Sequence, residues 1–305
     1  MRIIVALGGN ALLRRGQRPD ADVQEANVSA AVAALAPLGA EHELVVTHGN
    51  GPQVGVLALQ SASDPNLTTP YPFDVLGAQT QGMIGYWLLQ SMQNALPRRE
   101  VAAIINQTLV AADDPAFDEP TKFVGEVYDE AQARELADAR GWTVKPDGEG
   151  WRRVVGSPKP LRVVETELIR RVLASGAIVV CAGGGGVPVV QDASGQLEGV
   201  EAVVDKDLTA AVLAEALHAD ALLVLTDVSH VMHAFGTAAA TPIRRSTPAR
   251  LRRTEFPAGS MGPKVDAVCR FVEATGATAA IGRLEDAEAI LRGQTGTVVT
   301  PTIDE

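Results

Sequence analysis

Ile3-Ile4-Val5-Ala6-Leu7-Gly8-Gly9-Asn10 is the stretch that decides the fold of this 305-residue chain. Its apolar part, residues 3–7, does not alternate with polar residues and leads directly into a glycine turn. Such runs are typical of strands buried on both faces, because helices cover both sides of a parallel sheet. The segment therefore predicts a central parallel strand with a turn at its carboxyl end.

Similar apolar runs recur and alternate with helical patterns. Further runs cover residues 44–46, 101–105, 177–182, 221–225, 278–281 and 297–299, and helical periodicity covers residues 23–38, 52–60, 75–96, 163–174, 207–217, 263–275 and 285–291. Gly39, Gly176 and Gly276 follow helical runs and are expected to end them. The alternation predicts an α/β fold, a three-layer α/β/α sandwich around a mainly parallel sheet, in one domain covering residues 1–305.

Three glycine-rich turns follow predicted strands. They are Gly8-Gly9-Asn10, His48-Gly49-Asn50-Gly51-Pro52 and Gly183-Gly184-Gly185-Gly186. Glycine lets backbone N–H groups approach a ligand closely, and a helix N-terminus adds partial positive charge, so these turns suit phosphates. Because ligands of open α/β sheets bind at the carboxyl ends of strands, the turns are expected to gather at one edge. No G-x-x-x-x-G-K-[ST] string is present, so the site is not a P-loop.

Two lysines stand where predicted helices begin. Lys206 lies between Asp205 and Asp207, and Lys264 ends the segment 259–264. A cation in a first helical turn opposes the helix dipole at a cost of roughly 0.3–1 kcal/mol, and a bound phosphate would reverse that sign. Removing either lysine should therefore leave stability without ligand unchanged or slightly higher. A solvated surface lysine remains the alternative interpretation of each residue alone.

Composition limits the classes of partner. The formal net charge of −11 argues against nucleic acid. The longest apolar runs are far shorter than the ~20 residues that span a bilayer, and residues 1–5 do not resemble a signal peptide. Cys181 and Cys269 fit neither a disulfide framework nor a zinc site, so we expect a protein of the reducing cytoplasm.

Residues 113–160 differ from the rest of the chain. The segment is charged, rich in proline and glycine, and contains one helical pattern at residues 129–140. We expect it to form a small protruding lid subdomain inserted between elements of the sheet. A long surface excursion is the alternative, although a structureless loop of this length would be unusual.

Several polar residues admit competing interpretations. Asn10 could donate to an oxyanion or serve as a turn residue in the left-handed region. His48 is a weaker candidate for a general base than for a hydrogen-bonding turn residue. His230 and His233 have no apparent third ligand, which disfavours a metal site.

Residues 49–55 resemble a dinucleotide fingerprint with one extra residue. A Rossmann unit next needs a strand that ends in an acidic residue, but residues 63–70 are turn-forming. The dehydrogenase interpretation therefore fails on context.

Taken together and in order, the motifs resemble the amino acid kinase superfamily and, within it, the carbamate kinase family. The resemblance runs from Met1 to about Val299, and its matching segments are residues 6–12, 48–55, 80–87, 120–122, 151–155, 157–160, 183–190, 199–207 and 259–264. The Thr80-Gln81-Gly82 and Ser157-Pro158-Lys159-Pro160 strings look particular to carbamate kinases.

The resemblance implies reversible phosphoryl transfer between ATP and carbamate, giving ADP and carbamoyl phosphate, with Mg²⁺ and often in the direction of ATP. It implies that carbamate and the phosphoryl group bind at Gly8, Gly9, Asn10, Gly49, Asn50 and Gly51. It implies nucleotide contacts at Gly184, Gly185, Lys206, Thr226, Asp227, Met261 and Lys264. Lys122 would reach over the site from the lid, and Asp207 would orient the lysines. Family members are typically homodimers.

Two positions depart from the family pattern. Ser229 and His230 follow Leu225-Thr226-Asp227-Val228 where an acidic residue is expected, and Gly156 replaces a usual proline. The alternatives to a carbamate kinase are another superfamily kinase with a carboxylate or phosphate acceptor, and a nucleotide sensor without catalysis. The joint presence of Asn10, Lys122, Lys206 and Lys264 argues against the sensor.

Overall fold

The computed structural model describes residues 1–14, 16–256 and 260–303 of the chain. Its main sheet has eight strands in the order β15 (Arg245–Ser246), β17 (Thr297–Val299), β16 (Thr278–Arg283), β12 (Ala221–Thr226), β1 (Arg2–Leu7), β2 (Glu43–His48), β9 (Ile178–Val180) and β3 (Val101–Ala103). All neighbouring strands pair in parallel except β16 and β17, which are antiparallel. The predicted mainly parallel sheet is confirmed, with β1 at its centre.

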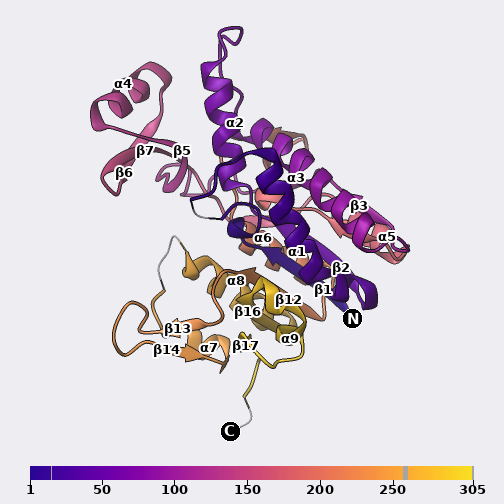
Figure 1. Ribbon diagram of the computed structural model, residues 1–305. Helices are drawn as coiled ribbons and strands as arrows, with labels where there is room; N and C mark the ends of the chain where they lie inside the picture. The colour runs from indigo at the N-terminus through magenta and orange to yellow at the C-terminus, as the bar shows by residue number, and fades with distance from the viewer. Residues whose placement is uncertain (15, 257–259, 304–305) are drawn as a thin grey trace.

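The apolar run of β1 contributes side chains to two separate hydrophobic cores, one on each face of the main sheet. Ile4 and Ala6 pack with α5 (Thr166–Ala174), α6 (Lys206–Ala216) and α8 (Met261–Thr275) on one face of the sheet. Ile3, Val5 and Leu7 pack with α1 (Ala21–Glu41), α3 (Phe73–Ala95) and α9 (Ala287–Leu291) on the other. Because successive side chains of a strand point to opposite faces, both sets must be apolar. The predicted three-layer arrangement follows directly (Figure 1).

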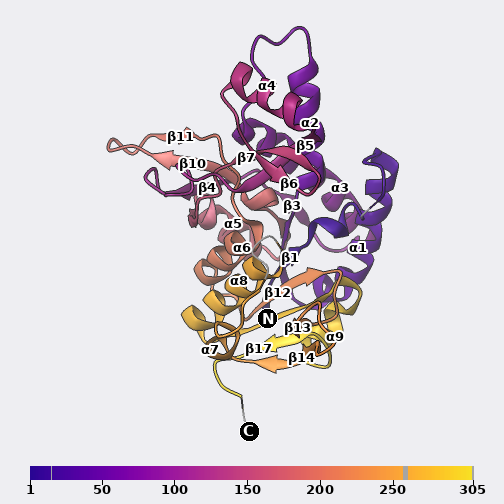
Figure 2. The same cartoon turned by 90° about the vertical axis from the view of Figure 1, so that its left-hand side faces the viewer.

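A second sheet of four strands lies beside the main one. Its order is β11 (Leu197–Gly199), β10 (Val187–Gln191), β4 (Gln107–Val110) and β8 (Pro160–Val163). Figure 2 shows the antiparallel pair of β10 and β11 projecting from the body. A two-stranded ribbon, β13 (Val231–His233) with β14 (Thr241–Ile243), and the short helix α7 (Pro248–Leu251) complete the body with α2 (Gly51–Ser63). No helix in the described ranges is both long and apolar enough to cross a membrane.

The chain leaves the body after β4 and returns at β8, and the intervening residues hold a small sheet of their own. It pairs β5 (Lys122–Tyr128), β7 (Gly150–Val155) and β6 (Thr143–Asp147) in antiparallel fashion, with α4 (Glu130–Arg140) beside them. Figure 1 shows these four elements standing apart from the main sheet. We use the word lid for residues 122–155.

The lid is attached to the body by a small apolar cluster and one arginine. Val124 and Val155 pack against side chains of α2 and α3. Arg153 lies 4.6 Å from the ring centroid of Trp142 in the lid and 5.0 Å from that of Phe73 in α3. Its guanidinium also donates to Glu201 of the body at 2.5 Å. The lid therefore has a separate sheet but a defined junction with the body.

Candidate active site

The turns after the central strands open onto a cavity of about 1120 Å³. It lies where the strands end, with lid residues on one side and the N-terminal ends of α6 and α8 on the other. The predicted site residues that line it are Gly8, Gly9, Asn10, Gly49, Asn50, Gly51, Lys122, Gly184, Lys206, Asp207, Thr226, Asp227, Met261 and Lys264. Segments that lie far apart in sequence thus meet at one edge of the sheet.

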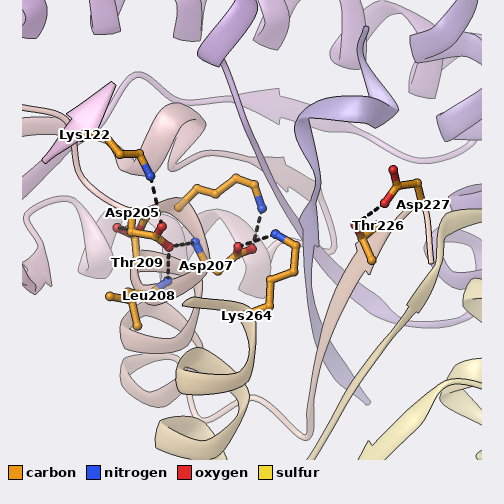
Figure 3. Close-up of polar contacts among 9 residues, drawn as sticks. Lys122, Asp205, Asp207, Leu208, Thr209, Thr226, Asp227 and Lys264 are labelled. Atoms are coloured by element: carbon orange, nitrogen blue, oxygen red, sulfur yellow. Dashed lines mark hydrogen bonds and ion pairs between the residues drawn. The ribbon is translucent and has the colours of Figure 1, made fainter. Parts of the chain in front are cut away.

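A buried ion triad occupies the floor of the cavity. Asp207 in the first turn of α6 receives Lys206 Nζ on Oδ1 at 2.5 Å and Lys264 Nζ on Oδ2 at 2.9 Å. The side chain of Asp207 is only 3% exposed, and those of Lys206 and Lys264 are 14% and 16% exposed. Figure 3 shows the lysine from α8 approaching Asp207 across the gap between two helices. Both lysines line the cavity, with their ammonium groups held against the Asp207 carboxylate.

Electrostatics explains why this triad can form in a buried place. Burial alone would raise the pKa of Asp207, but Lys206 and Lys264 outweigh it and hold that pKa below its usual range. Burial lowers the pKa of Lys206, Asp207 opposes that shift, and the neighbouring Lys264 adds to it. Two cations share one anion, so the triad carries a net positive charge that a phosphate can neutralise.

The glycine turns touch one another closely. A Cβ atom on Gly184, whose φ is +64°, would come within 2.2 Å of the Asn50 amide, and one on Gly49 would come within 3.3 Å of Gly9. Asn50 is itself held by a hydrogen bond to Thr80 Oγ1 at 2.8 Å. Glycine is therefore required here for close approach of backbones. The N–H groups of Gly8 and Gly49 already donate to the carbonyls of Leu225 and Leu7, at 2.8 and 3.2 Å, and so hold the turns to the ends of the strands.

Asn10 links the acceptor side of the predicted site to the nucleotide side. Its Nδ2 donates to Asp227 Oδ2 at 2.7 Å, and Thr226 Oγ1 donates to Asp227 Oδ1 at 3.2 Å. The amide is thus oriented by a carboxylate from the end of β12. The left-handed turn interpretation of Asn10 is wrong, because this residue lies in the 3-10 turn Gly9–Ala11 and its φ is not positive. The oxyanion role stays a prediction, and Asn10 does line the cavity.

Two residues considered from the sequence lie outside this lining. Gly185 packs behind the cavity wall, and its carbonyl accepts hydrogen bonds from Thr108 and Thr209. His48 is 1% exposed, and its Nδ1 lies 2.9 Å from the Gly49 carbonyl. Burial lowers the pKa of His48 to about 4, so the imidazole is neutral at pH 7. His48 is a packing residue of the second turn and has no access to the cavity.

Sequence reasoning missed several residues of the cavity wall. Asp205 pairs with Lys122. Phe123 and Arg152 line the lid wall together with Val124 and Gly125, and the Arg152 guanidinium lies 5.9 Å from the Phe123 ring centroid. Phe235, which is 72% exposed, lines the opposite end with His230. Arg152 belongs to the matching segment 151–155, but the sequence assigned it no role. Phe235 belongs to none of the motifs found in the sequence. Gly259, quoted with the Lys264 segment, lies outside the described residues.

The described residues contain no group of three or more histidine, cysteine, aspartate or glutamate side chains that could hold a metal ion. Both oxygens of Asp207 contact lysines. One oxygen of Asp205 accepts backbone N–H groups and the other pairs with Lys122. Asp227 is the exposed carboxylate at the cavity. This donor set fits a Mg²⁺ ion held mainly by nucleotide phosphates and water, which is the ordinary mode for Mg²⁺ in phosphoryl-transfer sites.

Fold and cavity together define a class: an α/β protein in which glycine turns and paired lysines meet at the carboxyl ends of parallel strands. The profile of the amino acid kinase family matches residues 1–283. The carbamate kinase of Rhizobium meliloti (strain 1021) is 50% identical over 309 residues, covering 100% of this chain and 95% of that protein. The carbamate kinase of Escherichia coli (strain K12) is 46% identical, covering 98% and 99%.

A solved structure shows the same similarity to carbamate kinases. Carbamate kinase from Giardia lamblia bound to AMP-PNP superposes with a TM-score of 0.91 at 36% identity, covering 98% of both chains. The chain belongs to the amino acid kinase family, and within it to the carbamate kinases. It is an ATP-dependent phosphotransferase, as the motif resemblance predicted. The dehydrogenase interpretation is excluded, and the sensor interpretation has no support from these relatives.

Proposed function

We propose that the cavity catalyses reversible transfer of a phosphoryl group between ATP and carbamate, and that the chain supplies ATP from carbamoyl phosphate and ADP. The buried triad of Lys206, Asp207 and Lys264, facing the glycine turns across one cavity, is the observation that carries this proposal. The full-length likeness to carbamate kinases supplies the identity of the acceptor.

In the carbamate-phosphorylating direction, a carbamate oxygen attacks the γ-phosphorus of ATP. The new P–O bond forms as the bond from that phosphorus to the β,γ-bridging oxygen breaks, and ADP leaves with the electron pair. Carbamate is already an anion, so no proton has to be removed from the nucleophile. The neutral, enclosed His48 agrees with this chemistry, which needs positioning and charge neutralisation and no general base.

Each residue of the cavity has a role that follows from its position. Lys206 and Lys264 neutralise charge on the transferring phosphoryl group and the departing ADP, and Asp207 orients both lysines. The N–H groups of Gly9, Asn10, Asn50 and Gly51 bind carbamate and phosphoryl oxygens. Gly8 and Gly49, whose N–H groups donate to the sheet, let the ligand approach the backbone closely. Lys122 completes the site from the lid. Asp227, the exposed carboxylate of the cavity, is the residue that would help to hold a Mg²⁺ ion bound with the nucleotide, and that ion would add positive charge at the phosphates.

Two further proposals concern the assembly and location of the protein. Exposed apolar side chains at Tyr86, Ile105, Leu161 and Leu168 lie on α3, after edge strand β3, on β8 and on α5. We propose that this edge of the main sheet is the homodimer surface. Cys181 and Cys269 are buried free thiols, which agrees with a reducing cytoplasm.

The decisive experiment measures ATP formed from ADP and carbamoyl phosphate by purified protein, with and without Mg²⁺. We expect ATP only with Mg²⁺. ATP binding by calorimetry without any transfer would favour a sensor. Transfer to another carboxylate or phosphate acceptor, with none from carbamoyl phosphate, would favour a different kinase of the superfamily.

A further inference from the structure

The carboxylate that caps α6 has a second partner on the lid. Oδ1 of Asp205 accepts the N–H groups of Asp207 and Leu208 at 2.9 and 3.2 Å. Its other oxygen, Oδ2, lies 3.5 Å from Nζ of Lys122. Figure 3 shows Lys122 reaching from the lid to this carboxylate. One side chain therefore joins the lid to the N-terminus of the helix that carries the buried triad.

Asp205 is the fixed member of this pair. Its side chain is 15% exposed, against 45% for Lys122. Its own carbonyl accepts both the N–H and the hydroxyl of Thr209, at 3.0 and 3.1 Å. The carboxylate is thus anchored by α6 at one oxygen, and the other oxygen remains for a long, flexible lysine from another part of the molecule.

We infer that Asp205 is a positioning residue for phosphoryl transfer: it holds the Lys122 ammonium at the cavity before substrates bind. The inference rests on the proposed function, in which Lys122 contacts the transferring group. A lysine stem has much rotamer freedom, and a partner that restricts it beforehand reduces the ordering needed in the transition state. Asp205 itself touches no reacting atom, because its oxygens face the helix N-terminus and the lysine.

The capping role and the positioning role can be separated by one substitution. Asparagine caps helices as well as aspartate does, because one side-chain oxygen suffices. Asp205→Asn therefore keeps the acceptor for the α6 N–H groups and removes the negative charge that attracts Lys122. Asp205→Ala removes both the acceptor for the α6 N–H groups and the negative charge, and it serves as the matched control for loss of the cap.

The experiment is a double-mutant cycle with Asp205→Asn and Lys122→Ala, in which kcat for ATP formation and the Kd for ADP are measured. We expect Lys122→Ala to lower kcat by about 10²–10³ with little change in the Kd for ADP. Asp205→Asn should lower kcat by about tenfold to a hundredfold, with Tm and the Kd for ADP unchanged. The double variant should lie close to Lys122→Ala, since Asp205 acts mainly through that lysine. The charge of Asp205 also raises the pKa of Lys206, as the smallest of the causes that act on that group, so only a small further loss is expected.

Hydrogen exchange supplies a readout apart from activity. In the ligand-free Asp205→Asn protein, amides of Lys122–Tyr128 should exchange faster while those of Lys206–Ala216 stay as in the parent protein. A wild-type or higher kcat in Asp205→Asn beside an impaired Lys122→Ala would overturn the inference alone, as would additive losses in the double variant. Wild-type turnover in Lys122→Ala would instead overturn the proposed role of Lys122, and the inference with it.

Discussion

The two lysine sites of the cavity differ in how they are built. Lys206 and Lys264 are nearly enclosed and share Asp207 at 2.5 and 2.9 Å, all from helices that cover the same face of the main sheet. Lys122 is half-exposed, has a single ion pair at 3.5 Å, and comes from a separate small sheet. The body holds its cations in a buried triad, whereas the lysine of the lid, by our proposal, can be withdrawn.

This difference has a physical reason. Fixed dipoles and charges stabilise a transition state best when they need no reorganisation during the reaction. A site closed on all sides, however, would admit no substrate, so at least one wall has to move. The comparison between the buried triad and the lid lysine leads to four predictions, given from the largest expected effect to the smallest.

Asp207→Asn should have the largest effect. It removes the negative charge that both buried lysines contact and leaves two like charges close together. We expect kcat to fall by at least about 10³ and the free energy of unfolding to fall by about 3–5 kcal/mol. Asp266→Asn, which alters a half-exposed surface pair with Arg252, is the control and should stay within about 0.5 kcal/mol. Urea unfolding and steady-state kinetics measure both quantities, and equal behaviour of the two variants would refute the role of the triad.

Lys206→Ala and Lys264→Ala should each lower kcat by about 10²–10³, equivalent to about 3–4 kcal/mol of transition-state stabilisation. The dipole argument from sequence predicts unchanged or higher stability, but it takes no account of the bond to buried Asp207. With one partner lost, we now expect the free energy of unfolding to fall by roughly 1–3 kcal/mol. Exposed Lys159→Ala is the control. Near wild-type turnover in both triad variants would remove the core of the mechanism.

Arg153→Gln tests the junction of the lid. The guanidinium lies against the rings of Trp142 and Phe73 and pairs with Glu201 across the boundary. Loss of these contacts should loosen the lid and reduce kcat/KM for carbamoyl phosphate by roughly threefold to tenfold. Arg134→Gln removes an exposed lid charge that lies over Trp151 and is the matched control. If the two variants lose the same activity, the junction has no special role.

Replacement of His48 should have the smallest effect on activity, and it should change the pH dependence of stability only at acidic pH. Its pKa is about 4 in the folded protein and 6.5 when the ring is exposed, so the unfolded state binds the proton first. The contribution of His48 to stability should therefore be present in full well above pH 6.5 and be lost as the pH falls from about 6.5 to 4, by about 3 kcal/mol in total. His48→Asn should flatten that part of the pH profile of unfolding. A parallel profile for both proteins would show that His48 does not cause the loss.

Sequence alone predicted the parts of the site whose chemistry is local. Glycine turns and lysines at helix starts are recognisable because backbone conformation and dipole direction depend on neighbours in the chain. Gly276 does end α8 with φ +69°, whereas Gly39 lies inside α1. A Cβ there would come within 2.8 Å of Leu96, so this glycine serves packing between elements.

What the sequence did not disclose depends on contacts between distant segments. The pair of Lys122 with Asp205 joins strand β5 of the lid to the start of α6, and the Arg153 stack joins lid and body. The strands of the lid were also missed, because charged residues such as Lys145 and Arg152 interrupt the apolar pattern that marks a buried strand. Three-dimensional pairing, rather than local propensity, determines these features.

The most direct test of the contrast between body and lid is hydrogen exchange with and without ligand. The ligand pair is MgADP with phosphonoacetamide, in which a methylene group replaces the bridging oxygen of carbamoyl phosphate. We predict that strands β5, β6 and β7 become markedly more protected on binding, while Lys206–Ala216 is already protected in the free protein and changes little. Equal gains in both regions, or no gain in the lid, would contradict the account of a preformed triad and a mobile lid lysine.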